Sequence, residues 1–336
     1  MKSFLQMSLV ALLLSAIGCG ERTTSTHATD SDKALPSPYH IVTTCGMVTD
    51  IVRQVVGDLA TVTGIMGSGV DPHLYKPTTD DVKLLMEADA IFYSGLMLEG
   101  RMADSFMKVA RRGKPVYAVT ELVDESNLLE PPEFDGHWDP HLWMDVEAWS
   151  MCVMAVATAL AEIDAEHADV YRSNAATYVE QLDALDAYAK QVIGSIPEPR
   201  RVLITAHDAF NYFGRAYKID VRGIQGISTE SEAGLSDINA LVDLLVDRQV
   251  SAIFTESSVS EKNIAALQEG AARHGHDVAI GGELFSDAMG AGGSYEGTYI
   301  GMIDHNATII ARALGGDAPI RGMQGKLAIE HEHAND

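Results

Sequence analysis

Positive charge is scarce in this sequence. Its 336 residues include 24 lysines and arginines against 48 aspartates and glutamates, for a formal net charge of −24 at pH 7. Because nucleic acid attracts basic surfaces, this balance argues against a nucleic-acid partner. Long apolar runs are also scarce, and after Cys19 we expect no segment to cross a membrane. The hydrophobic fraction of 46% is typical of a globular chain, and the length suffices for two domains with their own cores.

Cysteine is rare, and some catalytic motifs are missing. Two of the three cysteines, Cys45 and Cys152, lie beyond the N-terminal segment. They form either two buried thiols or a disulfide, which an extracytoplasmic compartment permits. The chain contains no His-Glu-x-x-His sequence and no nucleophile motif, so it carries no signature of a hydrolase.

The first residues have the features of a targeting segment. The stretch Leu5–Ile17 is apolar, and Ala16–Cys19 resembles the cleavage box of bacterial lipoproteins. This resemblance implies a signal peptide over residues 1–18, export across the inner membrane and lipidation of Cys19. The alternative is an ordinary secretory signal with an incidental cysteine. Residues 19–38 are rich in Ser, Thr, Asp and Pro, which predicts a flexible tether.

The rest of the chain alternates between strand and helix patterns with short connections. Strands are predicted over residues 39–44, 60–66, 90–94, 114–119, 201–205, 221–224, 250–255 and 278–280. Helices are predicted over residues 46–56, 99–112, 235–247, 261–274 and 298–314, with a further helix start at Thr78 and Asp81. This alternation indicates an α/β fold with parallel sheets covered by helices.

The longest helical pattern separates two such α/β series. It runs from Val146 to about Ile196, has no proline, and has no glycine before Gly194. The pattern predicts either two helices or one long helix that bridges two domains. The predicted division is an N-terminal α/β domain, the linker, a C-terminal α/β domain and a tail, over residues 39–145, 146–196, 197–318 and 319–336.

A short motif occurs twice and points to metal chemistry. Gly69–Pro77 contains Asp-Pro-His, and Asp139–Asp145 contains it again. Proline fixes its own φ and disfavours helix in the residue before it, so both histidines should lie on stiff loops. We interpret His73 and His141 as half of a metal site.

The other half is predicted from strand ends. His207 and Asp287 each follow a predicted strand within a few residues, and parallel sheets bind ligands at the carboxyl ends of their strands. All four side chains can therefore meet between the domains, although His207 could instead lie in the core and Asp287 could cap a helix. Three imidazoles and one carboxylate suit Zn²⁺ or Mn²⁺.

Four further acidic residues lie beside these ligands or at strand ends. They are interpreted either as acceptors that orient the imidazoles or as loop caps: Asp71, Asp139, Asp208 and Glu256. The remaining histidines, among them His137, His274, His276, His331 and His333, are interpreted as loop, surface or tail residues.

The order of motifs resembles one family, the metal-binding lipoproteins of bacterial zinc and manganese ABC transporters, or TroA-like proteins. The resemblance runs from about Tyr39 to about Leu314. The segments that carry it are Thr44–Asp50, Gly69–Tyr75, Asp139–Asp145, Thr205–Phe210, Gly226–Gly234 and Leu284–Met289.

The resemblance implies a structure and a role. It implies two α/β lobes of about four strands each, joined by one long rigid linker helix near Val146–Ile196. It also implies one Zn²⁺ or Mn²⁺ per chain, held by His73, His141, His207 and Asp287. The protein would be a monomeric, non-enzymatic binding protein, lipid-anchored on the extracytoplasmic or periplasmic face. It would pass metal to a permease driven by a cytoplasmic ATPase.

The resemblance leaves the metal open between zinc and manganese. Members dedicated to manganese often have a glutamate where this chain has His207. Members dedicated to zinc often have a His-rich loop, whereas Glu121–Trp138 contains only His137. Two other functions compete with transport: a secreted metal-dependent hydrolase, and a surface adhesin whose metal is structural. A catalytic zinc usually keeps a position open for water, and four converging ligands argue against that.

Overall fold

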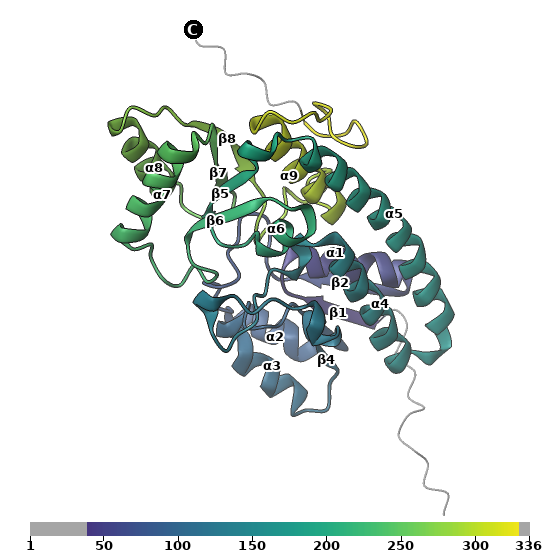
Figure 1. Ribbon diagram of the computed structural model, residues 1–336. Helices are drawn as coiled ribbons and strands as arrows, with labels where there is room; N and C mark the ends of the chain where they lie inside the picture. The colour runs from purple at the N-terminus through teal and green to yellow at the C-terminus, as the bar shows by residue number, and fades with distance from the viewer. Residues whose placement is uncertain (1–38, 329–336) are drawn as a thin grey trace, which may run out of the picture. The chain divides into compact units, whose positions relative to one another are not determined.

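A computed structural model describes residues 39–328 of the chain (Figure 1). The predicted signal peptide and tether, including Cys19, lie outside the described residues. The tail histidines His331 and His333 do so as well.

The first lobe is built on a parallel sheet in the order β2-β1-β3-β4. Its strands are β1 (Tyr39–Thr43), β2 (Ala60–Gly64), β3 (Ala90–Tyr93) and β4 (Val116–Ala118). Its helices are α1 (Gly46–Val56), α2 (Thr79–Glu87) and α3 (Ala103–Ala110). Each helix connects two strands, and such crossovers are what parallel pairing requires. The predicted strands and helices of this half are all present, with ends that differ by a few residues.

The start of α2 fixes one end of the loop that carries His73. Thr78 Oγ1 accepts a hydrogen bond from the backbone N–H of Asp81 at 3.2 Å, and Asp81 Oδ2 accepts one from the backbone N–H of Thr78 at 2.7 Å. This reciprocal cap satisfies two donors that a helix start leaves free, and it confirms the predicted helix start. Tyr75 also donates to Asp81 Oδ2, at 2.7 Å, which ties the loop itself to the helix.

The helical pattern after residue 145 is two helices, which is one of the two predicted alternatives, and the single linker helix over residues 146–196 is wrong in its extent. The helices are α4 (Val146–Ile163) and α5 (Ala168–Gly194), which pack against each other. The break falls at Asp164, whose carboxylate accepts a hydrogen bond from Tyr171 and contacts the His167 ring. No glycine or proline lies at this break. The side chains of Asp164, His167 and Tyr171 contact one another there instead. The long helix between the lobes is α5 alone.

Helix α5 is bonded to both lobes. Near its middle, the Tyr178 hydroxyl donates to Asp50 Oδ2 of α1 at 2.6 Å. Further along, the Tyr188 hydroxyl lies 2.7 Å from Thr308 Oγ1 of α9 (Tyr299–Ala313), in the second lobe. The helix therefore links the two lobes by direct contacts as well as by the chain.

The largest apolar cluster is shared by the lobes and the helical pair. It includes Ile51 of α1, Trp149 of α4, Leu182 of α5 and Ile303 of α9, none of them exposed. Truncating one such side chain to alanine typically costs about 2–5 kcal/mol. A wide rotation of one lobe would expose this cluster, so the lobes are joined by a packed core and not by a loose hinge.

Helix α4 is long and apolar enough to cross a membrane by length and composition, contrary to the expectation that no segment after Cys19 would be. Half of the stretch Val146–Ile163 is buried inside the protein. Its side chains Trp149, Cys152 and Val156 are fully buried in the shared cluster. The apolar composition of α4 therefore serves the core.

The second lobe contains four strands in two parallel pairs, β5–β6 and β7–β8, with β5 packed beside β7. The strands are β5 (Val202–His207), β6 (Asp220–Gln225), β7 (Ala252–Glu256) and β8 (Ala279–Leu284). The helices, besides α9, are α6 (Asn211–Tyr217), α7 (Leu235–Arg248) and α8 (Lys262–Arg273). Helix α6 was not predicted, and β8 continues past the predicted end at residue 280. In Figure 1 the strands of the second lobe are separate from the sheet of the first lobe, and α9 lies beside α5.

Candidate metal centre

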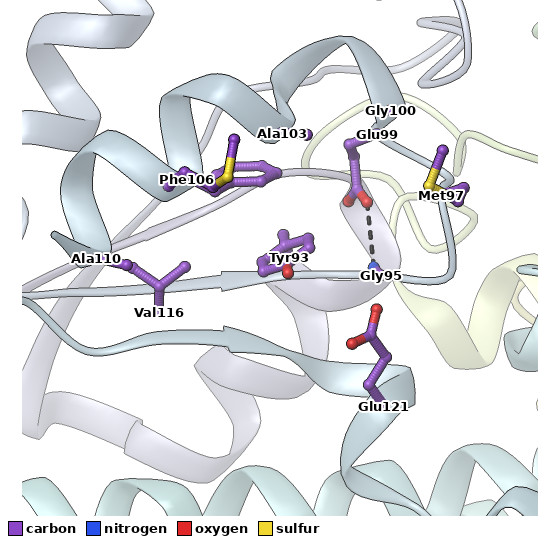
Figure 2. Close-up of a pocket in the computed structure, with 11 residues that line it drawn as sticks. Tyr93, Gly95, Met97, Glu99, Gly100, Ala103, Phe106, Ala110, Val116 and Glu121 are labelled. Carbon is purple, nitrogen blue, oxygen red and sulfur yellow. Dashed lines mark hydrogen bonds between the residues drawn. The ribbon is translucent and has the colours of Figure 1, made fainter.

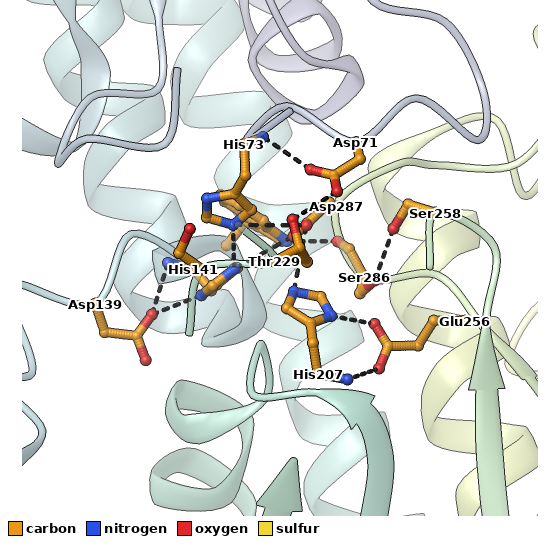
Figure 3. A network of polar contacts seen from close by, with 12 residues as sticks. Asp71, His73, Asp139, His141, His207, Thr229, Glu256, Ser258, Ser286 and Asp287 are labelled. Atoms are coloured by element: carbon orange, nitrogen blue, oxygen red, sulfur yellow. Dashed lines mark hydrogen bonds and ion pairs between the residues drawn. The ribbon is translucent and has the colours of Figure 1, made fainter. Parts of the chain in front are cut away.

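The four predicted ligands come together between the lobes (Figure 3). One ligand atom each from His73, His141, His207 and Asp287 lies within 4.8 Å of all the others. His73 lies in the loop after β2 and His141 in the loop after β4, whereas His207 ends β5 and Asp287 follows β8. All four therefore stand beyond or at the carboxyl ends of parallel strands, as the sequence predicts.

The two Asp-Pro-His motifs form the same local structure. Asp71 Oδ1 accepts a hydrogen bond from the backbone N–H of His73 at 2.8 Å, and Asp139 Oδ1 accepts one from His141 at 3.0 Å. Each aspartate thus closes a turn over the proline that follows it, which has no N–H of its own to donate. The repeated motif is a device that presents an imidazole from a stiff loop.

The separations between ligand atoms match a small metal polyhedron. Nε2 of His73 lies 3.4 Å from Nε2 of His141. The oxygens of Asp287 lie 3.3 Å from His141 Nε2, 3.2 Å from His207 Nε2 and 3.7 Å from His73 Nε2. Bonds of about 2.0–2.1 Å in a tetrahedron place neighbouring ligand atoms about 3.4 Å apart. The residues present therefore fit a first-row divalent ion.

The site contains buried polar atoms that make no hydrogen bond. His207 Nε2 and both carboxylate oxygens of Asp287 are buried without a hydrogen-bond partner among the described residues, although they lie at ion-pair distance from each other. Buried polar groups in proteins are normally satisfied, and an exception calls for an explanation. A metal ion supplies it, because it would accept these lone pairs directly.

The metal-free site carries opposite charges. Burial alone would lower the pKa of His141, but the carboxylates of Asp139 and Asp287 raise it to about 9. Burial likewise opposes the charged form of His207, yet Glu256 and Asp287 raise its pKa well above the usual value. Burial alone would raise the pKa of Asp287, but His207 and His141 hold it well below its usual range. Two imidazolium ions therefore surround one carboxylate when no metal is bound.

The third imidazole differs. Burial lowers the pKa of His73 to about 3, although Asp287 opposes this shift. The nearby imidazoles of His141 and His207 push in the same direction as burial. His73 is therefore neutral at neutral pH and ready to bind a cation.

Two of the four predicted acidic partners contact ligand rings. Asp139 Oδ1 lies 2.7 Å from His141 Nδ1, and Glu256 Oε2 lies 2.5 Å from His207 Nδ1. Glu256 also accepts a hydrogen bond from the backbone N–H of His207 at 2.8 Å. A carboxylate on Nδ1 leaves Nε2 free to face a metal and raises the basicity of the ring.

The other two acidic residues connect to the histidines through backbone groups or through other side chains. Asp71 holds the backbone of the His73 loop through its contact with the His73 N–H. Asp208 accepts a hydrogen bond from Asn211 Nδ2 at 2.9 Å, and the same amide donates to Asp139 Oδ2 at 3.1 Å. Asp208 is thus linked to the His141 ring through two intermediates.

A family model matches most of the chain. Residues 41–313 match the family described as zinc-uptake complex component A, periplasmic. The chain belongs to this family.

Two known proteins are similar over nearly the whole chain. The manganese-binding lipoprotein MntA of Bacillus subtilis (strain 168) is 43% identical over 316 residues, covering 94% of this chain and 100% of that protein. The zinc-binding protein TroA of Treponema pallidum (strain Nichols) is 44% identical over 299 residues, covering 89% and 96%.

A solved structure matches as well. The periplasmic zinc-binding protein TroA from Treponema pallidum has a TM-score of 0.79 at 45% identity, covering 82% of this chain and 99% of that chain. The predicted resemblance and the two-lobed α/β fold with a long helix are confirmed.

Some residues around the site were not predicted. Asn211, at the start of α6, bridges Asp139 and Asp208, but an asparagine after a strand carries no distinct signal. Trp143 Nε1–H donates a hydrogen bond to the carbonyl of Ser286 at 3.0 Å, and the centre of its ring lies 5.3 Å from that of His141. It therefore ties the loop after β4 to the Asp287 loop. Its place inside the second Asp-Pro-His segment was the available clue.

The remaining histidines of the described part do not join the four-residue cluster, although His137 lines the same cavity as His73. His276 Nε2 contacts the carbonyl of Val250, and the exposed His274 follows α8. His137 is exposed and its ring lies 5.2 Å from that of Phe134. The two cysteines in the described range, Cys45 and Cys152, are free and buried, so the thiol alternative is the correct one.

A separate cavity of about 270 Å³ opens in the first lobe between β3, β4 and α3 (Figure 2). Phe106, Val116 and Ala103 supply apolar walls, and none of the four ligands lines it. At its edge, the carboxylate of the buried Glu99 accepts hydrogen bonds from the backbone N–H groups of Ser94 and Gly95 at 2.8 and 3.2 Å. Both oxygens of Glu99 are therefore occupied with holding the β3 loop, and the cavity is not part of the metal centre.

Proposed function

We propose that this chain is the solute-binding protein of an ABC transporter and that it captures one divalent transition-metal ion between its lobes. The proposed ligands are Nε2 of the three histidines His73, His141 and His207, with the carboxylate of Asp287. The observation that carries this proposal is the convergence of these four buried groups from both lobes, with ligand atoms within 4.8 Å of one another.

The proposed cargo is Zn²⁺ or Mn²⁺. Two relatives of nearly equal similarity are named for different metals, manganese for MntA and zinc for TroA. Three imidazole nitrogens and one oxygen suit tetrahedral zinc. Both oxygens of Asp287 face the imidazoles, so a bidentate carboxylate would also serve manganese. Zinc binds more tightly at most such sites, so supply and geometry together decide which ion is carried.

The proposed route of the metal involves a membrane complex. The family implies a permease with a cytoplasmic ATPase as partners, and relatives are named as lipoproteins. We propose that Cys19 is lipidated after removal of residues 1–18 and that residues 19–38 tether the protein to an extracytoplasmic membrane face. The metal-binding part would then be lobes over residues 39–145 and 197–318, acting as a monomer without enzymatic activity.

The competing functions are less well supported. A metal-dependent hydrolase needs a bound water and a substrate next to the metal, whereas three of the four ligands here are at most 1% exposed. The relatives named above are named for binding a metal, and a further relative, PsaA of Streptococcus pneumoniae, is named a manganese ABC transporter substrate-binding lipoprotein, which favours transport.

The decisive experiment measures metal in the purified mature protein by elemental analysis. Competition titrations of the metal-free protein with Zn²⁺ and Mn²⁺ should follow. One equivalent of metal is expected in the parent and in His274→Ala, a control at an exposed histidine. His207→Ala should lose it while the metal-free protein still folds. Absence of stoichiometric metal from the parent, with no binding on titration, would overturn the proposal.

A further inference from the structure

One of the four metal-centre residues is held differently from the others. The rings of His141 and His207 are hydrogen-bonded at Nδ1 to the carboxylates of Asp139 and Glu256, respectively. His73 is anchored through its backbone, whose N–H donates to Asp71 Oδ1. The position of its imidazole therefore depends on what holds the loop around it.

His73 is also the ligand next to open space. It is 6% exposed, whereas His141, His207 and Asp287 are at most 1% exposed. It lines a cavity of about 410 Å³, which we call the vestibule. The vestibule is walled by both lobes, with Arg101 and Phe134 from the first and Ser228 and Glu230 from the second. A metal ion that passes through the vestibule meets His73 first on its way in and leaves it last.

A hydrogen bond across the lobes holds the His73 loop. Thr229, in the loop between β6 and α7, donates its hydroxyl to Asp71 Oδ2 at 2.6 Å (Figure 3). The other oxygen of that carboxylate accepts the backbone N–H of His73. One aspartate thus joins the second lobe to the backbone of a first-lobe ligand.

An adjacent ion pair reaches the other side of His73. Glu230 Oε1 lies 2.9 Å from Arg101 Nε, and Arg101 Nη1 donates to the carbonyl of Leu74 at 3.2 Å. Thr229 therefore holds the loop before His73, through Asp71, and Glu230 holds it after His73, through Arg101. We call these two interactions the clasp. The two interactions of the clasp differ in strength, because Thr229 is 8% exposed whereas the Glu230 side chain is 52% exposed. A buried hydrogen bond to a carboxylate contributes more than a solvated ion pair.

We propose that Thr229 is a positioning residue for His73, assisted by the Arg101–Glu230 pair, and that this clasp sets the rate at which metal leaves through the vestibule. The proposal rests on the proposed function. When the clasp breaks, the loop can carry His73 away from the other three ligands. The metal then keeps three of its four protein ligands and exchanges faster with solvent.

The test compares two substitutions at one position. Zn²⁺ dissociation is measured on the mature chain with a chelating dye in excess. Thr229→Val removes the hydroxyl at nearly constant volume and should speed dissociation about tenfold, which corresponds to about 1.4 kcal/mol. Thr229→Ser keeps the hydroxyl and should dissociate at close to the parent rate. Thr177→Val, at an exposed hydroxyl on α5, is the matched control and should behave as the parent.

A second measurement separates the clasp from general loosening. Glu230→Gln should speed dissociation by a smaller factor, about two- to fivefold, because the pair is solvated. Its difference from the parent should shrink in 1 M salt, where the screening length is about 3 Å. A purely structural defect would not depend on salt in this way.

Each outcome decides the matter. Unchanged dissociation from Thr229→Val, or equally fast dissociation from Thr229→Ser, overturns the proposal. If Thr229→Val does not fold, as judged by melting of the metal-free protein, Glu230→Gln decides alone, and an unchanged rate overturns the proposal. A parent protein that binds neither Zn²⁺ nor Mn²⁺ would instead refute the proposed function itself, and this inference with it.

Discussion

Nε2 of His141 in the first lobe lies 3.3 Å from Oδ1 of Asp287 in the second, and neither side chain is exposed to solvent. The same nitrogen lies 3.4 Å from His73 Nε2, so it faces the centre of the cluster. In the metal-free protein this pair is an imidazolium and a carboxylate, because each raises the stability of the other's charged form. A metal ion needs both atoms, so proton and metal compete for one nitrogen.

This competition predicts a steep pH dependence of metal affinity. The pKa of His141 is about 9 and that of His207 is raised well above its usual value, so both rings carry a proton at pH 7. Metal must displace these protons, and raising the pH removes that cost. His73, with a pKa of about 3, is already neutral and contributes nothing. Affinity should rise from pH 6 to pH 8 by about tenfold per unit for each proton displaced.

Competition titrations at several pH values measure that slope. Calorimetry in buffers of different ionisation enthalpy counts the released protons directly. An affinity that stays constant between pH 6 and pH 8 would contradict the assignment of His141 and His207 as ligands.

Replacing the central carboxylate should weaken binding strongly. Asp287→Asn removes the one anionic ligand, and loss of one partner of a buried charge pair costs about 3–5 kcal/mol. Zn²⁺ affinity should therefore fall about 10²- to 4 × 10³-fold, since each tenfold step is about 1.4 kcal/mol. Asp169→Asn, at a fully exposed aspartate on α5, should leave the affinity unchanged. Equal affinity of Asp287→Asn and the parent in competition titrations would remove Asp287 from the site.

The carboxylates behind the imidazoles should have smaller effects. Glu256→Gln and Asp139→Asn keep the shape of the side chain but remove the charge that rests on Nδ1 of the ring. Loss of such a partner typically lowers metal affinity about 10- to 100-fold. Glu269→Gln, an exposed residue of α8, is the control in the same titration. If both site variants bind as tightly as the parent, the rings are oriented by their loops alone.

The two thiols should be unreactive until the protein unfolds. Cys45 and Cys152 are free and buried, and burial raises the pKa of Cys45 to about 12. Because the thiolate is the nucleophile, neither should react with iodoacetamide in the folded state. Mass spectrometry of a Cys19→Ser variant should find two labels in guanidinium chloride and none without it. No labelling under either condition would mean that the two cysteines form a disulfide.

The fold was predictable from the sequence to the level of its elements, with clear limits. Periodic apolar residues and the Thr78–Asp81 cap located most strands and helices, because these signals act within a few residues. Two helices were one of the predicted alternatives, but the position of the break between α4 and α5 was not predictable, because it falls at Asp164, which contacts His167 and Tyr171, and not at a proline. The apolar composition of α4 was likewise ambiguous until its neighbours were known.

The sequence by itself determined how His73 and His141 are presented: Asp-Pro-His closes a turn over a proline that cannot donate, and it does so twice from local chemistry alone. Only the tertiary structure decided what the ligands meet. The pairing of Glu256 with the His207 ring joins two strands, and the clasp of Thr229 on Asp71 joins two lobes. Such contacts depend on the relative placement of distant segments, which is set by the shared core around α5 and not by any short motif.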